Sequence, residues 1–159
     1  MGIHKKEYAL LIEESKEMLY RLAYGYLGNE TQAIDALDEA VYLGFIHRKE
    51  LREITFAKTW LTRILIHECY RLLNRQKREV VTDIIPEYTN EDIHDDEYDN
   101  LPLKEAVKKL PDELRKVIAL RYFGGYTIAE TAVILDIPDG TVATRTRKAL
   151  SLLKVELED

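Results

Sequence analysis

Apolar residues recur every three to four positions along most of this chain, which is the spacing of amphipathic helices. In the first half of the chain this spacing predicts three helices, with a polar loop over residues 48–55 before the third. Gly28 is a stop signal for the first helix, and Asn29 with Gln32 can form a capping box that starts the second. We expect these helices over residues 5–27, 29–47 and 56–78, the second burying Leu37, Ala40, Val41 and Phe45.

Residues 79–101 interrupt the helical pattern. They contain nine acids, Pro86 and no Lys or Arg, which is the composition of a linker. Beyond them the pattern predicts helices over residues 103–110 and 114–123, the second closed by Gly124-Gly125. The expected fold class is all-α, with two small helical domains, 1–78 and 102–159, joined by an acidic flexible linker, 79–101.

Residues 126–150 predict two short helices joined by a tight turn, the shape of a helix-turn-helix DNA reader. Thr127 and Glu130 can form a capping box that starts a helix at Ile128, and Asp136-Ile137-Pro138 ends it. A second helix begins near Pro138 or Asp139. Its residues Val142, Thr146, Ala149 and Leu153 are expected to face the core together with Ile134, Leu135 and Ile137. Its outward residues, the expected DNA contacts, are Thr141, Thr144, Arg145, Arg147 and Lys148.

Each of these assignments has a simpler alternative. The two short helices could form a packed hairpin whose cations only face water, and Arg145 could pair with an acid such as Glu130.

For nucleic-acid binding, the distribution of charge along the chain is more informative than the net charge. The formal net charge of −6 argues against nucleic-acid binding, but without the nine acids of residues 79–101 the rest of the chain carries +3. Residues 60–78 alone hold five cations against one acid, Glu68. With 46% hydrophobic residues, the 159-residue chain can also bury a substantial core.

Motifs for catalysis, metal binding and membrane insertion are absent from the sequence. The four His residues have no metal-ligand spacing, and a single Cys69 allows neither an intramolecular disulfide nor a Cys-pair metal site. There is no phosphate-binding Gly loop, no nucleophile elbow, no membrane-length apolar run and no secretory signal. We therefore expect a cytoplasmic protein that is neither an enzyme nor a membrane protein and that uses no cofactor or metal.

Three groups of residues stand in a fixed order along the chain. The first comprises Tyr20-Arg21-Leu22-Ala23-Tyr24 and Asp35-Ala36-Leu37-Asp38-Glu39, and the second comprises Phe56, Trp60-Leu61-Thr62-Arg63-Ile64 and Arg75-Gln76-Lys77-Arg78. The third comprises Leu110-Pro111, Leu120-Arg121-Tyr122-Phe123 and Gly140-Thr141-Val142. Over nearly the whole chain, this set resembles the extracytoplasmic-function (ECF) group of bacterial sigma-70-type sigma factors.

The resemblance implies a factor that binds core RNA polymerase and directs promoter-specific initiation, in a stress or envelope-signal response under an anti-sigma factor. It assigns polymerase binding and minus-ten recognition to residues 1–78, and minus-thirty-five recognition to residues 102–159. The implied polymerase contacts are Asp35, Asp38 and Glu39. The implied minus-ten DNA contacts, which combine aromatic surface with positive charge, are Phe56, Trp60, Arg63, His67, Arg71, Arg75, Lys77 and Arg78.

Other interpretations remain for parts of this set and for the chain. Trp60 could be a core residue, and Arg75, Lys77 and Arg78 could be a solvated helix end favoured by the helix dipole. The whole chain could instead be a stand-alone helix-turn-helix transcriptional regulator, or a helical adaptor that does not touch DNA.

Overall fold

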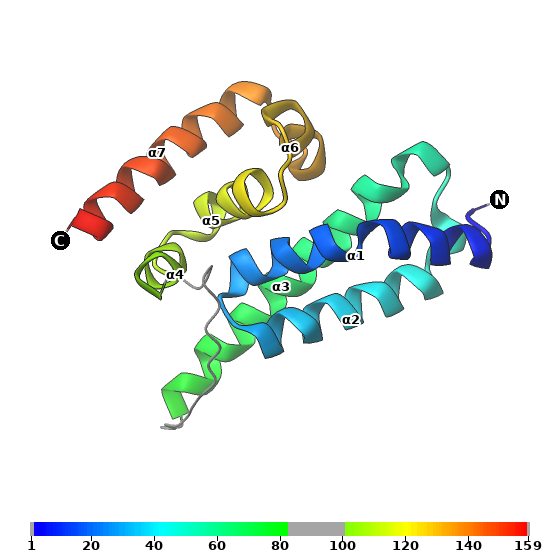
Figure 1. Cartoon of the computed structure of the whole chain (residues 1–159), viewed down its shortest axis with the longest axis horizontal. Helices are drawn as coiled ribbons and strands as arrows, with labels where there is room; N and C mark the ends of the chain where they lie inside the picture. The colour runs from blue at the N-terminus through cyan, green and yellow to red at the C-terminus, as the bar shows by residue number, and fades with distance from the viewer. Residues whose placement is uncertain (1, 83–100, 159) are drawn as a thin grey trace.

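The computed structural model describes residues 2–82 and 101–158, and residues 76–82 by their backbone alone. Every regular element in these ranges is helical, in two groups (Figure 1). The amino-terminal half comprises α1 (Lys5–Leu27), α2 (Glu30–Ile46), the short 3-10 turns η1 (Arg48–Glu50) and η2 (Ile54–Phe56), and α3 (Ala57–Thr82). The carboxy-terminal half comprises α4 (Leu101–Lys108), α5 (Asp112–Ile118), the π-helical turn η3 (Ala119–Phe123), α6 (Ile128–Leu135) and α7 (Asp139–Glu158).

The helix boundaries follow the predicted stop and start signals. Gly28 adopts the left-handed conformation, with φ of 69°, and its N–H bonds the Tyr24 carbonyl at 2.7 Å. Asn29 then caps α2 by accepting a 2.8 Å hydrogen bond from the backbone N–H of Gln32. The predicted first helix, residues 5–27, is confirmed at both ends.

The three helices of the amino-terminal half pack on one another around a shared apolar cluster. Leu19 and Leu22 of α1 and Leu61 and Leu65 of α3 are at most 1% exposed. Phe45 was wrongly expected in this core, since it is 37% exposed at the end of α2. It instead contacts the Tyr8 ring and the Arg48 guanidinium.

Helix α3 is longer than the sequence pattern predicts. It continues to Thr82, past the expected end at Arg78. Residues 76–79, Gln-Lys-Arg-Glu, are all good helix formers, so the acidic segment begins inside the helix.

The helix-turn-helix forms as the sequence predicts. The Thr127 hydroxyl accepts from the Glu130 N–H at 3.1 Å, and the Glu130 carboxylate accepts from the Thr127 N–H at 2.9 Å. Asp136 ends α6 in the left-handed conformation, with φ of 58°. In α7 the predicted inward residues Val142, Thr146, Ala149 and Leu153 are all buried.

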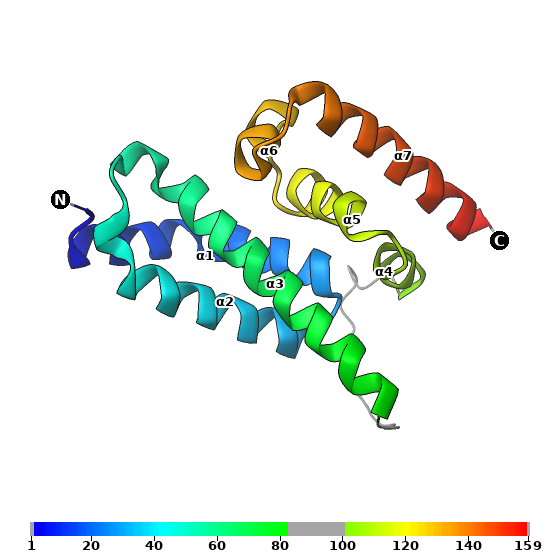
Figure 2. The ribbon, with the colours of Figure 1, turned by 180° about the vertical axis from the view of Figure 1, so that it is seen from behind.

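The two halves are in direct contact, with α5 and α6 against α1 and α3, and α7 on the side facing away from them (Figures 1 and 2). Ile134 is buried, as expected, at 4% exposure, but it lies in the cluster formed mainly by α1–α3 and not in the clusters that contain Val142 and Ala149 of α7. Ala119 and Leu120, both fully buried, enter the same cluster from η3.

The turn η3 explains how the two buried residues reach α1. The Gly124 N–H bonds the Ala119 carbonyl at 2.8 Å, five residues back, and the Tyr126 N–H bonds the Leu120 carbonyl at 3.0 Å. The sequence predicted a uniform helix over residues 114–123, whereas this segment widens at Ala119 and packs against α1.

The capping box at α6 gives a test of the fold. We expect Thr127→Ala to lower the free energy of unfolding by about 1 kcal/mol, because the Glu130 N–H loses its acceptor. Thr127→Ser keeps the hydroxyl and should retain most of this stability. Urea denaturation would measure both variants, and equal losses for Ala and Ser would contradict this role of the hydroxyl.

Candidate nucleic-acid interface

The outward face of α7 carries the predicted DNA-reading residues. Thr144, Arg147 and Lys148 are exposed, and the Arg147 guanidinium lies 3.5 Å from the Thr144 hydroxyl. Thr141 is half-buried in the first turn, where its N–H bonds the Pro138 carbonyl at 3.0 Å. These residues form one polar and basic surface near the start of the helix.

Arg145 is positioned differently from its neighbours. Its guanidinium lies 3.3 Å from the Glu113 carboxylate of α5, and its side chain is 31% exposed. The suggested partner Glu130 is instead occupied by the capping box. Arg145 therefore links the recognition helix to α5, through an acid that sequence spacing alone did not identify.

The predicted minus-ten residues recur at three- and four-residue spacing along α3, starting from η2. Phe56 and Trp60 are half-buried, and Arg63, His67, Arg71 and Arg75 are exposed. Trp60 packs against the core, in agreement with the alternative interpretation of this residue as a core side chain. It is only partly buried, so part of its surface remains exposed to solvent. Lys77 and Arg78 lie on the α3 backbone, and their side chains fall outside the described residues.

Glu68 is an acidic partner of the basic residues in the middle of this face of α3. It is 5% exposed and accepts hydrogen bonds from the Arg71 guanidinium at 2.9 and 3.2 Å. The neighbouring His67 side chain is 72% exposed, with Nδ1 3.8 Å from the same carboxylate. Aromatic surface thus gives way to a row of cations along α3, an arrangement suited to single-stranded nucleic acid.

Arg63 connects this face of α3 to α6 in the carboxy-terminal half. Its Nε donates to the Ile134 carbonyl at 2.9 Å, and its Nη2 donates to the Val133 carbonyl at 2.6 Å. Both carbonyls lie in the last turn of α6, where the helix dipole favours a cation, and the Val133 carbonyl also accepts from the Asp136 N–H at 3.2 Å. This contact has no signature in the sequence, because the partner of Arg63 is backbone about 70 residues away.

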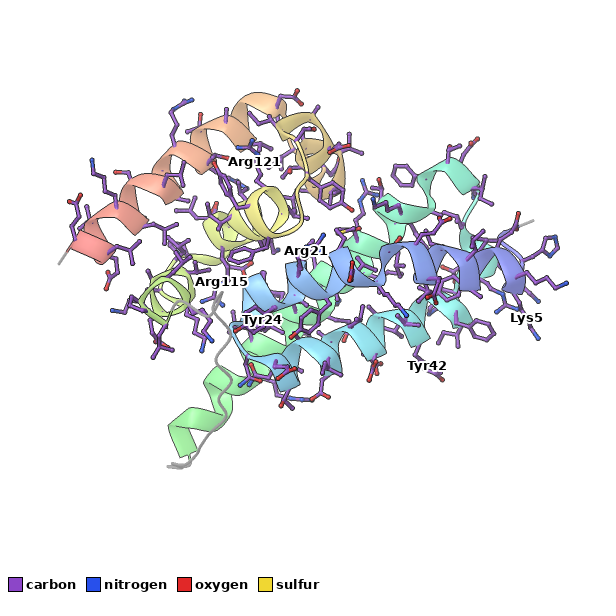
Figure 3. All side chains as sticks on the ribbon, viewed as in Figure 1. Lys5, Arg21, Tyr24, Tyr42, Arg115 and Arg121 are labelled. Atoms are coloured by element: carbon purple, nitrogen blue, oxygen red, sulfur yellow. The ribbon has the colours of Figure 1, made fainter. Side chains whose placement is uncertain are left out.

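Further polar contacts join the two halves around the end of α1. The Tyr26 hydroxyl donates to the Asp112 carboxylate, and the Arg115 guanidinium lies 5.4 Å from the centre of the Tyr26 ring. Arg115 is 1% exposed and donates to the Val107 and Lys108 carbonyls at the end of α4. Figure 3 shows Arg115 and Tyr24 where α4 and α5 meet α1.

A second set of contacts lies along α3. The Thr62 and Tyr126 hydroxyls are 2.9 Å apart, and the Lys116 ammonium lies 4.9 Å from the centre of the Tyr70 ring. The carboxy-terminal half therefore covers a stripe of α3 next to its row of cations.

The predicted polymerase contacts lie on α2. Asp35, Asp38 and Glu39 are all exposed, while α2 packs against α1 and α3 with its other face. Large apolar side chains are exposed on the same helix, which the sequence analysis did not single out; they are Ile34, Tyr42, Phe45 and Ile46. Acidic and apolar groups together are suited to a protein partner.

Within residues 2–82 and 101–158, no helix has the length and apolar character needed to cross a bilayer.

Two family models match the chain, one for each half. Sigma-70 region 2 matches residues 11–79, and Sigma-70, region 4 matches residues 100–153. Among curated relatives, the chain is 30% identical over 147 residues to RNA polymerase sigma factor SigV of Bacillus subtilis (strain 168), covering 92% of this chain and 88% of SigV. It is 27% identical over 171 residues to ECF RNA polymerase sigma factor SigW of the same strain, covering 96% and 89%.

Solved structures share the fold at lower identity. The sigma factor RpoE in complex with the anti-sigma factor NepR from Bartonella quintana matches with a TM-score of 0.72 and 23% identity, over 97% of this chain and 96% of RpoE. CnrH in complex with the cytosolic domain of CnrY matches with a TM-score of 0.68 and 18% identity, over 98% and 90%.

The burial of Tyr26 can be tested through the pH dependence of the protein's stability. Burial, and then the bond to Asp112, raise the pKa of Tyr26 well above its usual value, and burial raises the pKa of Tyr8 to about 12. Because a raised phenol pKa favours the folded state only below the unfolded value near 10, stability should fall as pH rises above about 10. In a spectrophotometric titration these phenols should ionise late, together with unfolding.

Tyr26→Phe and Tyr8→Phe should each remove one tyrosine from this late step. An unchanged late amplitude in Tyr26→Phe would contradict the described burial of Tyr26.

Proposed function

The chain belongs to the sigma-70 family of RNA polymerase sigma factors, in the ECF subgroup, and we propose that it binds polymerase through α2 and promoter DNA through α3 and α7. The observation that carries this proposal is the pairing of a basic, partly aromatic helix with a separate helix-turn-helix, each within a matched sigma region. A stand-alone regulator would need only the second of these. In this proposal the chemistry belongs to the polymerase, and the chain itself is not an enzyme.

In the carboxy-terminal half, α7 is the proposed reader of the minus-thirty-five element. Its outward Arg147 and Lys148 can bond guanine edges and phosphates, and Thr144 can bond phosphate or either base partner. Arg145 is proposed to contact phosphate while its pairing with Glu113 fixes its direction. Thr141 completes the set at the first turn.

In the amino-terminal half, α3 is the proposed reader of the melted minus-ten element. Phe56 and Trp60 supply surfaces on which bases stack. The cations that follow them along the helix supply charge for the displaced strand; they are Arg63, His67 when protonated, Arg71, Arg75, Lys77 and Arg78.

The proposed partners follow from the same surfaces. Asp35, Asp38 and Glu39 would meet a basic surface of core polymerase, with the exposed apolar residues of α2 beside them. An anti-sigma factor is the proposed regulator, since the structural neighbour RpoE is in complex with one. The protein would act in the cytoplasm, where the polymerase works.

Run-off transcription tests the function as a whole. Purified core polymerase should initiate at specific promoters only when this protein is added. Asp35→Lys with Glu39→Lys should weaken polymerase binding by about tenfold or more, because like charges would then meet across the interface. Glu14→Lys with Glu17→Lys makes the same charge change on exposed α1 positions and should bind as wild type does. Equal affinity of both double variants would exclude α2 as the docking helix.

A substitution at Arg147 tests whether α7 reads the promoter DNA. With promoter DNA selected by the holoenzyme from a random library, we expect Arg147→Ala to lose about 1–3 kcal/mol of binding, roughly fivefold to 150-fold in affinity, if the guanidinium grips a base. Lys154→Ala, an exposed cation further along α7, should change little. Unchanged binding of Arg147→Ala would remove that residue from the interface.

A further inference from the structure

We propose that Gly2 and Ile3, which precede α1, are positioning residues that hold Phe56 and Trp60 in place as the base-stacking surface of α3. Both lie at the end of the amino-terminal half where residues 47–56, here called the α2–α3 loop, join α2 to α3 (Figures 1 and 2). The inference rests on the proposed function, in which Phe56 and Trp60 stack on bases of the melted strand. Neither Gly2 nor Ile3 is among the expected DNA contacts.

The α2–α3 loop has little regular structure of its own. Its two 3-10 turns, η1 and η2, span three residues each, and residues 51–53 between them belong to neither. Its own backbone bonds close single turns, such as the 3.0 Å bond from the Phe56 N–H to the Glu53 carbonyl. Bonds of this kind shape each turn but do not fix where the turn lies against the helices. The position of the loop therefore depends on contacts from outside it.

Ile3 supplies such contacts through both its backbone and its side chain. Its N–H donates to the Arg48 carbonyl in η1 at 3.2 Å. The residue is 4% exposed and lies in a small apolar cluster with Leu51 of the loop and Ala57, the first residue of α3. Trp60 packs against the same cluster. Ile3 therefore ties the first turn of the loop, its middle and the beginning of α3 to one point.

Gly2 lies directly against the backbone of η1. Its φ is +90°, in the region that glycine adopts without strain and other residues rarely enter. A Cβ built on Gly2 would lie 2.5 Å from Cα of Lys49 and 2.8 Å from the carbonyl oxygen of Arg48. Because both are backbone atoms, they cannot rotate away as the end of a side chain could. Any side chain at position 2 would therefore displace η1 or the segment before α1.

The cluster around Ile3 lies at the aromatic start of the minus-ten face. Ala57, which follows Phe56 directly, is buried in it, and Trp60 packs on it one turn further along α3. The Phe56 ring also lies 5.1 Å from the guanidinium carbon of Arg63. Stacking requires ring and base to meet in a defined geometry. If the loop shifts, only a fraction of the molecules presents both rings correctly, and the apparent affinity for DNA falls by that fraction.

Gly2→Ala and Ile3→Ala test the proposal in the holoenzyme. The probe is single-stranded DNA with the minus-ten sequence of a promoter that the wild-type holoenzyme selects from a random library. Both variants should bind it about tenfold more weakly, because the stacking surface is in place less of the time. Ile3→Leu keeps the side-chain volume and should bind within about twofold of wild type. Wild-type affinity in both Gly2→Ala and Ile3→Ala would overturn the proposal.

Abasic nucleotides in the probe distinguish positioning from a general loss of stability. With the wild-type holoenzyme, removing a base that stacks should weaken binding. With Gly2→Ala the same removal should cost much less, because the surface is already misplaced. Met18→Ala, which removes a partly buried contact from the main cluster of α1–α3, should show the full wild-type loss. Equal losses in wild type and Gly2→Ala, or a reduced loss in Met18→Ala as well, would overturn the proposal.

Hydrogen exchange on the wild-type holoenzyme needs no variant to fold. The amides of Ile3 and Phe56 should exchange slowly, and more slowly still with the probe bound. An Ile3 amide that exchanges as fast as an unprotected one would overturn the proposal.

The abasic probes also separate the two levels of inference. If no base removal weakens binding to the wild-type holoenzyme, the proposed stacking role of Phe56 and Trp60 fails. If wild type responds and both variants respond identically to it, only the positioning role of Gly2 and Ile3 fails.

Discussion

The two halves of this protein share one apolar cluster, and most of the structure depends on that sharing. Ala119, Leu120 and Ile134 are buried not under the recognition helix but among residues of α1 and α3. Burial of apolar side chains is the main favourable term in folding, so neither half is fully covered without the other. The contact between the two halves is held by this core and oriented by the Arg63 and Tyr26 hydrogen bonds.

Local signals predicted the elements of the fold well. Gly28, Asn29, the Thr127–Glu130 box and Asp136 each act through neighbours within a few residues, so sequence spacing was enough to place helix ends. The inward face of α7 was predicted for the same reason. The candidate surfaces on α2, α3 and α7 are also local, because each is one face of one helix.

What the sequence did not predict depends on distant partners. Arg63 bonds backbone carbonyls about 70 residues away, and any sequence offers such carbonyls. The widened turn at Ala119 has no sequence signature, yet it decides that Ala119 and Leu120 face α1. Glu113 rather than Glu130 pairs with Arg145, because the capping box had already occupied Glu130.

The charge pattern links this architecture to function. A chain with net charge −6 can still present basic surface to DNA, because α3 and α7 each carry a group of cations while nine of the acids lie in residues 79–101. The carboxy-terminal half packs against α1 and α3 through α4, α5, η3 and α6, while α7 lies on the side facing away from them (Figure 1).

The most direct test of the account is the distance between α2 and α7, measured by single-molecule fluorescence transfer with labels on exposed positions of each. Because the two halves share one apolar cluster, the free protein should give one short distance. A broad range of distances in the free protein would contradict the account.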